Sequence, residues 1–291
     1  MKSTKPKAPV MIPVDNLVPF DGHPYKVLDD DSMNDLTESV QESGILEPIT
    51  VRPLENTDNY EIISGHRRYH AAKKAGLHDV PAFIRAVSRD EAAIMLVDSN
   101  LHRERILPSE KAFAYKLKAE ALNHQGKRDI TSGQFVPKSD DNRATAQIGE
   151  QTGESYKTVQ RYIRLTNLIP ELLDMMDENK IAFSVGVELS FLDDQLQYDV
   201  LNACEENDNT PSYAQAVRMH KAYEAGELDR DGIEEIMCEM KANQRDKVTI
   251  PLDRLKGKIP GSYSVQQQQD YIVKAVDHYH RYLQKQREQA R

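Results

Sequence analysis

Two short basic motifs carry the clearest chemistry in this chain. Residues 65–72 read GHRRYHAA and residues 100–103 read NLHR. An arginine guanidinium group can hold phosphate oxygens through paired, charge-assisted hydrogen bonds, and glycine or amide groups beside it can complete such a site. The residue types and their order therefore predict a site for a phosphate-bearing anion.

The charge of the whole chain makes these motifs stand out, because the chain is acidic. Its 291 residues carry a formal net charge of −9, and 39% of them are hydrophobic. Residues 101–170 contain 12 Lys and Arg against 8 Asp and Glu, residues 171–240 contain 4 against 18, and residues 253–291 contain 8 against 4. Two basic zones thus flank an acidic one, which favours a polyanionic partner such as nucleic acid.

The same composition argues against a membrane or secreted protein. No apolar run approaches the roughly 20 residues that a membrane-spanning helix needs. Residues 1–9 are basic but lack the apolar core of a signal peptide, so we expect a disordered arm on a cytoplasmic, nucleoid-associated protein. Cys204 and Cys238 lack metal-ligand spacing and are expected to be reduced thiols.

The elements that must position the first motif form a predicted α+β domain over residues 10–104. Residues 48–52, 60–63 and 80–84 are rich in β-branched and aromatic side chains, which predicts strands. Apolar residues recur at helical spacing between them, at Met33, Leu36 and Val40 and again at Tyr69, Ala72 and Ala75. The first motif directly follows strand 60–63, so its arginines are expected at a strand-to-helix turn whose free N–H groups can bind an anion.

Residues 105–240 are predicted to be helical. Pro108 suits the first turn of a helix, and the polar residues 125–143 are expected to form an exposed loop. Farther on, Gly153 ends one helix and Ser155 can cap the next, which is the pattern of a helix-turn-helix. The residues expected to contact DNA are Ser155, Tyr156, Lys157, Thr158, Gln160, Arg161 and Arg164.

Side-chain chemistry assigns roles within this second helix. Gln160 and Arg161 suit adenine and guanine edges, whereas Lys157 and Arg164 suit phosphates. The alternative is two packed helices of an ordinary bundle, because Val-x-x-Tyr-Ile is core spacing in any helix. The basic outward face favours DNA.

Residues 241–291 are expected to form a dimerisation element. Residues 248–252 alternate like a short strand, and residues 264–267 (SVQQ) offer a capping box for a final helix. One stripe of that helix is apolar, so it needs a partner. The stripe consists of Tyr271, Ile272, Ala275, Val276, Tyr279, Tyr282 and Leu283.

Taken in this order, the motifs resemble the ParB family of partition proteins, over most of the chain. Residues 44–52 (GILEPITVR) are similar to the family's Gly-Leu-Leu-Gln-Pro-Ile-x-Val stretch, and residues 65–72 to its Gly-Glu-Arg-Arg-x-Arg-Ala motif. Residues 99–103 are similar to Glu-Asn-x-x-Arg, and residues 153–165 to its helix-turn-helix.

This resemblance implies a dimer that binds CTP and magnesium and closes as a clamp on DNA at a centromere-like site. Asn100 would help to coordinate magnesium, the C-terminal helix would dimerise, and a ParA-type ATPase would engage the N-terminal arm. The residues implied to bind the nucleotide are Leu46, Glu47, Pro48, Gly65, Arg67, Arg68, Asn100 and Arg103.

Three departures from the family pattern bear on activity. His66 and Ser99 stand where the family has carboxylates associated with hydrolysis and metal coordination, which argues against CTP cleavage. Leu189 replaces an arginine that contacts the usual centromere, so a different DNA target is expected. Such divergence favours a plasmid or integrative element.

Two alternatives remain at this point. One is a ParB-derived transcriptional regulator of a mobile element, and the other is an enzyme of the sulfiredoxin or ParB-like nuclease kind. Residues 64–67 (SGHR) are similar to sulfiredoxin's Gly-Cys-His-Arg, but Gly65 replaces the nucleophilic cysteine. His66, His70 and His102 lack the spacing of a zinc site.

Overall fold

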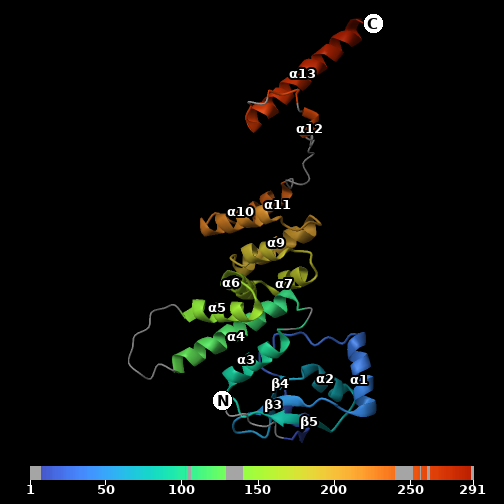
Figure 1. Cartoon of the computed structure of the whole chain (residues 1–291), viewed down its shortest axis with the longest axis vertical. Coiled ribbons are helices and arrows are strands. Elements are labelled where there is room, and N and C mark those ends of the chain that lie inside the picture. The colour runs from blue at the N-terminus through green and yellow to red at the C-terminus, as the bar shows by residue number, and fades with distance from the viewer. Residues whose placement is uncertain are drawn as a thin grey trace. The chain divides into compact units, whose positions relative to one another are not determined.

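The computed structural model (Figure 1) describes residues 8–101, 103, 106–128, 140–239, 252–255, 257–260 and 263–289. The chain divides into two compact units, Met1–Glu239 and Met240–Arg291, and each is described by itself. None of the helices in the described ranges combines the length and the apolar character that crossing a bilayer requires.

The N-terminal part of the first unit is built on a five-stranded mixed sheet in the order β1-β5-β3-β4-β2. β1 pairs antiparallel with β5, β5 parallel with β3, β3 antiparallel with β4, and β4 parallel with β2. The strands are β1 (Val10–Pro13), β2 (Leu17–Val18), β3 (Ile49–Pro53), β4 (Tyr60–Ser64) and β5 (Asp79–Ile84), and a short 3-10 helix, η1 (Val14–Asn16), joins the first two.

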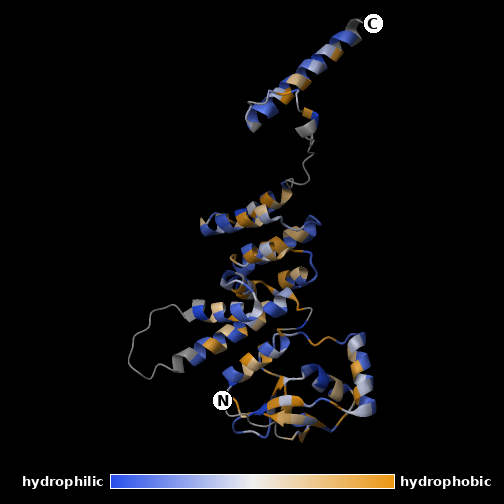
Figure 2. Cartoon of the chain, in the orientation of Figure 1, coloured by the Kyte–Doolittle hydropathy of each residue, from blue (hydrophilic) through white to orange (hydrophobic). Residues whose placement is uncertain are grey.

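Three helices cover this sheet: α1 (Asp31–Ser43), α2 (His66–Lys74) and α3 (Arg89–Asn100). Neighbouring residues of β4 pack against different helices, because successive side chains of a strand point to opposite faces of the sheet. Ile62 packs with residues of α1 and α2, whereas Ile63 packs with residues of α3. Figure 2 shows largely hydrophobic colours along β3 and β5. The predicted α+β class is confirmed.

The rest of the first unit is helical, as the sequence predicts. Its large core joins the later helices, from Leu165 to Met237. The elements are α4 (Pro108–Arg128), α5 (Asp140–Thr152), α6 (Tyr156–Arg164), η2 (Leu165–Asn167), α7 (Pro170–Asp177), α8 (Phe183–Leu189), α9 (Asp194–Glu206), α10 (Tyr213–Glu224) and α11 (Arg230–Cys238).

The loop predicted at residues 125–143 is too long at both ends. α4 continues to Arg128 and α5 begins at Asp140, while residues 129–139 lie outside the described ranges. Polar composition alone therefore overestimated the loop.

The second unit contains α12 (Leu252–Leu255) and α13 (Val265–Gln289). The capping box is confirmed, because Ser264 N–H donates to Gln267 Oε1 at 2.9 Å and Gln267 N–H to Ser264 Oγ at 3.4 Å. Most of the predicted strand, residues 248–251, lies outside the described ranges, and Leu252 begins α12 instead of ending a strand. The domain boundaries and the dimer role of α13 stay predictions.

Candidate functional site

The turn between β4 and α2 requires the glycine that the sequence places there. Gly65 has φ 103°, and a Cβ atom at this position would lie 2.7 Å from Ile49 Cγ2. Arg67 and Arg68 lie in the first turn of α2, and that turn contains no acidic residue. Gly65 provides no side chain to cap the helix, so free N–H groups and positive charge coincide at this end.

A hollow of about 310 Å³, here called the basic pocket, opens at this turn. Among the described residues, its lining includes four cationic side chains and no Asp or Glu. The residues that line it are His23, Tyr25, Lys26, Val27, Leu36, Ser64, Gly65, His66, Arg67, Arg68, Ser99, Asn100 and Arg103. Five of the eight predicted nucleotide-binding residues, Gly65, Arg67, Arg68, Asn100 and Arg103, thus meet in one place.

The other three predicted residues, Leu46, Glu47 and Pro48, lie beside the basic pocket and are not part of its lining. Arg68 connects them to it, because its Nη1 donates to the carbonyl oxygens of Glu47 and Pro48 and lies 3.1 Å from the Glu47 carboxylate. Leu46 is 82% exposed. The Arg68 guanidinium is therefore bonded to residues 47 and 48 beside the pocket.

The other two arginines of the pocket have neutral neighbours. Arg67 Nη2 donates to Ser32 Oγ at 2.6 Å, and the Arg103 guanidinium lies 5.3 Å from the centre of the Tyr25 ring. Neither arginine forms an ion pair with any residue in the described part of the chain. Their charges are therefore available to a ligand.

Asn100 is held rigidly at the end of α3. Its side chain is buried, and Nδ2 donates to Leu96 O at 2.8 Å and to Ser99 Oγ at 3.2 Å. With Nδ2 bonded back to α3, the amide oxygen is the atom that Asn100 can offer to a ligand. Ser99 in turn donates its hydroxyl proton to Leu96 O.

The sequence patterns missed three pocket residues, His23, Tyr25 and Lys26. They come from the irregular segment between β2 and α1, where no periodicity marks them. The centroids of the His23 and His66 rings lie 3.7 Å apart with their planes tilted by 37°, and His66 Nε2 accepts a hydrogen bond from Phe20 N–H at 3.4 Å. The Tyr25 hydroxyl is buried and has no hydrogen-bond partner among the described residues.

Both histidines are neutral at physiological pH. Burial, with smaller contributions from His23 and Arg103, lowers the pKa of His66 to about 3. Burial likewise lowers the pKa of His23 to about 4, which Arg103 reinforces and a backbone hydrogen bond at Tyr25 partly opposes. His70 turns instead to Asp29, at 2.9 Å, and His102 lies outside the described ranges. No cluster of three metal-binding side chains occurs among the described residues.

The helix-turn-helix expected from the sequence is present as α5, a tight turn and α6. Gly153 takes φ 74°, and the Ser155 hydroxyl accepts from Thr158 N–H at 3.1 Å, which confirms the cap. A Cβ atom on Gly149 would lie 2.5 Å from Glu154 O, so this glycine permits the close approach of α5 to the turn. Val159 is fully buried and anchors α6.

The outward face of α6 is narrower than predicted. Ser155, Tyr156, Lys157 and Arg161 are exposed, whereas Thr158, Gln160 and Arg164 are half-buried. Gln160 lines a small hollow together with α4 side chains.

Arg164 is part of the protein interior beside α8. Its guanidinium lies 3.9 Å from the centre of the Phe191 ring, and Nη2 donates to Ser190 O at 3.2 Å. Phe191 stacks on His220, whose Nδ1 lies 2.7 Å from Glu188 Oε2. The predicted phosphate contact therefore requires this stack to open. Leu189, at the position of the family's DNA-contacting arginine, is buried in the core.

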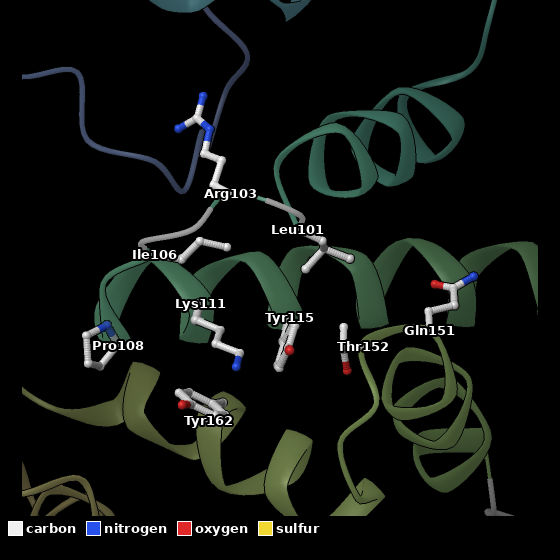
Figure 3. Close-up of a pocket in the computed structure, with 9 residues that line it drawn as sticks. All are labelled: Leu101, Arg103, Ile106, Pro108, Lys111, Tyr115, Gln151, Thr152 and Tyr162. Carbon is white, nitrogen blue, oxygen red and sulfur yellow. The ribbon is translucent and has the colours of Figure 1, made fainter.

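A second hollow, of about 300 Å³, lies where α4, α5 and α6 meet (Figure 3). Lys111 crosses it, with Nζ 4.5 Å from the centre of the Tyr162 ring and in an ion pair with Glu154. Arg103 also lines this hollow, but Figure 3 shows its side chain turned away from α4 toward the N-terminal segment. Arg103 thus stands between the basic pocket and the helix-turn-helix.

Comparison with known proteins agrees with this geometry. Residues 2–101 match the ParB N-terminal domain. The chain is 31% identical over 173 residues to the chromosome-partitioning protein Spo0J of Thermus thermophilus, covering 60% of this chain and 56% of the relative. It is 29% identical to a nucleoid occlusion protein of Lysinibacillus sphaericus, covering 68% and 60%. The matches thus span somewhat more than half the length of these relatives.

Solved structures give a remote likeness. C-terminally truncated ParB from Caulobacter crescentus complexed to the centromeric parS site is 21% identical, with a TM-score of 0.40, over 78% of this chain and 98% of that chain. The same protein complexed with CTP-gamma-S is 24% identical, with a TM-score of 0.32, over 64% and 93%. The sequence matches therefore make the chain similar to ParB/Noc-like partition proteins, and residues 2–101 match the ParB N-terminal domain.

Proposed function

We propose that this chain is a DNA-binding partition protein that binds a nucleoside triphosphate in the basic pocket and contacts DNA through α6. The observation that carries the proposal is the pocket itself, in which four cationic side chains meet at an uncapped helix N-terminus without a carboxylate. A triphosphate fits this charge and this set of donors. The resemblance to ParB proteins makes CTP the nucleotide to test first.

The DNA role rests on the exposed part of α6. Tyr156, Lys157 and Arg161 project from a capped helix that follows a tight turn, as in helices that enter the major groove. Lys157 and Arg161 supply positive charge, and α6 contains no acidic residue. Dimerisation through α13, a ParA-type ATPase partner and closure as a clamp on DNA belong to the same proposal, carried by the resemblance.

An enzyme is less well supported than a binding protein. The glycine at position 65 removes the nucleophile of a sulfiredoxin, and a metal-dependent nuclease needs a carboxylate cluster that the lining of the basic pocket lacks. The absence of carboxylates also argues against CTP hydrolysis in this pocket.

CTP binding and a genomic map of bound DNA test the proposal together, using the full chain, Arg67→Ala and the control Arg85→Ala. Arg85 is exposed and lies outside the pocket lining. Arg67→Ala should weaken CTP binding at least about tenfold, because a hydrogen bond to a charged group contributes ~1.5–3 kcal/mol. Arg85→Ala should bind like the wild type.

The DNA map distinguishes a partition protein from a regulator. Spreading over kilobases around one site, dependent on CTP and on Arg67, is the expected result. Narrow peaks at promoters that do not respond to CTP would contradict the clamp and favour the transcriptional regulator. Failure of the wild type to bind CTP would refute nucleotide binding.

A further inference from the structure

The basic pocket is poorly suited to magnesium. Mg²⁺ in nucleotide sites is held by one or two carboxylates together with phosphate oxygens and water. The oxygen-bearing side chains in this lining are neutral: the amide of Asn100 and the hydroxyls of Tyr25, Ser64 and Ser99. Ser99 already donates to Leu96 O and accepts from Asn100 Nδ2. Arg67 and Arg103, which form no ion pair with the described residues, share the same lining and would repel a metal cation.

Three carboxylates of neighbouring described segments already have hydrogen-bond or ion-pair partners. Glu110 accepts hydrogen bonds from Lys26 N–H at 2.8 Å and from Leu107 N–H at 3.1 Å, one on each oxygen. The Glu47 carboxylate lies 3.1 Å from Arg68 Nη1, and Glu61 Oε2 lies 2.6 Å from Arg52 Nε. None of these three belongs to the pocket lining, so a metal would find no anionic ligand from the described residues there.

The paired histidine rings, His23 and His66, reinforce this conclusion. His66 occupies the place of a family carboxylate, and its ring nitrogens are neutral because burial keeps the pKa near 3. A neutral imidazole is a ligand for zinc or copper, whereas magnesium prefers carboxylate, carbonyl and water oxygens. The pocket therefore lacks both the charge and the ligand type for magnesium.

The same residues are well suited to bind phosphate groups that carry no metal ion. Arg67 and Arg103 have neutral neighbours and can each take a phosphate oxygen pair. The Tyr25 hydroxyl is buried without a partner in the described part of the chain, a costly arrangement that an accepting phosphate oxygen would relieve. Lys26 contributes less, because its Nζ is paired with Asp174 at 2.8 Å and with Asp177 at 3.2 Å.

We propose that the basic pocket binds its nucleoside triphosphate without a divalent cation, with Arg67 and Arg103 neutralising the phosphates and the Tyr25 hydroxyl donating to one of their oxygens. The proposal rests on nucleotide binding as proposed above. It assigns this chain a mode of phosphate recognition that differs from the magnesium site implied by the family resemblance.

The test is equilibrium binding of CTP to the full chain in excess EDTA and in millimolar Mg²⁺. We expect the dissociation constants in the two conditions to agree within about threefold, since no pocket ligand requires the metal. Binding that appears only with Mg²⁺ would overturn the inference and leave the proposed function intact. No binding in either condition would refute nucleotide binding itself.

Two variants in EDTA probe the residues, with Arg85→Ala as the matched control. Arg103→Ala should lose at least about tenfold in CTP affinity, and Tyr25→Phe a few-fold, whereas the control should not change. Unchanged affinity in both Arg103→Ala and Tyr25→Phe would overturn the assignment. Tyr25→Phe keeps the ring under Arg103 and removes only an unpartnered hydroxyl, so it should fold normally.

A double variant, His66→Glu with Ser99→Glu, restores the carboxylates. It should bind CTP more weakly than the wild type in EDTA, because the new charges repel the phosphates, and Mg²⁺ should recover at least about tenfold. Equal CTP binding in EDTA and Mg²⁺ by a double variant with wild-type thermal stability would contradict the role given to positions 66 and 99.

Discussion

The turns that begin α2 and α6 look alike in sequence but differ in how their helix ends are satisfied. Each follows a glycine with positive φ, Gly65 or Gly153, and each helix has basic residues and no acid in its first turn. At α6, the Ser155 hydroxyl accepts from Thr158 N–H. At α2, Gly65 itself occupies the cap position and offers no acceptor.

This difference teaches which turn is built for an anion. A capped helix has used part of its N-terminal hydrogen-bonding capacity, so α6 presents its side chains rather than its backbone. An uncapped helix end surrounded by cations is incomplete without a negatively charged ligand. Under the proposed function, the α2 turn binds the anion, whereas the α6 turn is a scaffold for a recognition surface.

The largest effect on stability should come from replacing each of the two glycines with alanine. Gly65→Ala faces an unfavourable φ and a contact of 2.7 Å with Ile49 Cγ2, whereas Gly153→Ala faces the unfavourable φ alone, with open space around the added Cβ. We expect losses of roughly 3 kcal/mol and about 1 kcal/mol respectively in the free energy of unfolding. Chemical denaturation measures both. Similar losses would show that the α2 turn is no tighter than the α6 turn.

A second, smaller effect should distinguish the α2 turn by its pH dependence. The folded-state pKa values of His66 and His23, about 3 and about 4, lie below the usual value near 6.5. Between pH 6.5 and about 4 the unfolded chain therefore binds protons that the folded chain does not, and stability falls as the pH falls. Above pH 6.5 this pair contributes no pH dependence.

Thermal unfolding of the ligand-free protein from pH 7 to pH 5 tests this sign. The loss should be at most about 1.4 kcal/mol per histidine for each pH unit below 6.5. His66→Gln keeps an acceptor for Phe20 N–H and cannot titrate, so it should flatten the profile. An equally steep profile in that variant would show that other groups dominate.

Local patterns were enough to predict the strand-turn-helix at Gly65 and the helix-turn-helix at Ser155, because both depend on residues a few positions apart. They could not find Tyr25 in the basic pocket, which packs against residues some 40 or more positions away and belongs to no periodic element. Arg164 was misplaced for the same reason. Helical spacing puts it on the outward face, but Phe191, 27 positions later, draws it inward.

Arg161 and Arg164 allow a comparison within one helix, because both lie on α6 but only Arg161 is exposed. Arg161 is exposed, although its guanidinium lies 4.9 Å from the Phe183 ring centre. Arg161→Ala should weaken DNA binding by about tenfold. If Arg161 contacts a phosphate, the slope of log K against log salt concentration should also decrease by about one; if it reads a guanine, the preference for that base should relax. Titration of labelled target DNA at several salt concentrations measures this.

Arg164→Ala should behave differently, because it removes a packed side chain. It breaks the stack on Phe191 and the hydrogen bond to Ser190 O, so we expect a loss of about 1 kcal/mol in stability and a smaller loss in DNA affinity than Arg161→Ala causes. A larger effect of Arg164→Ala on DNA binding, at unchanged stability, would mean that the stack opens when DNA binds. Arg164 would then leave the Phe191 ring and contact a DNA phosphate only in the complex.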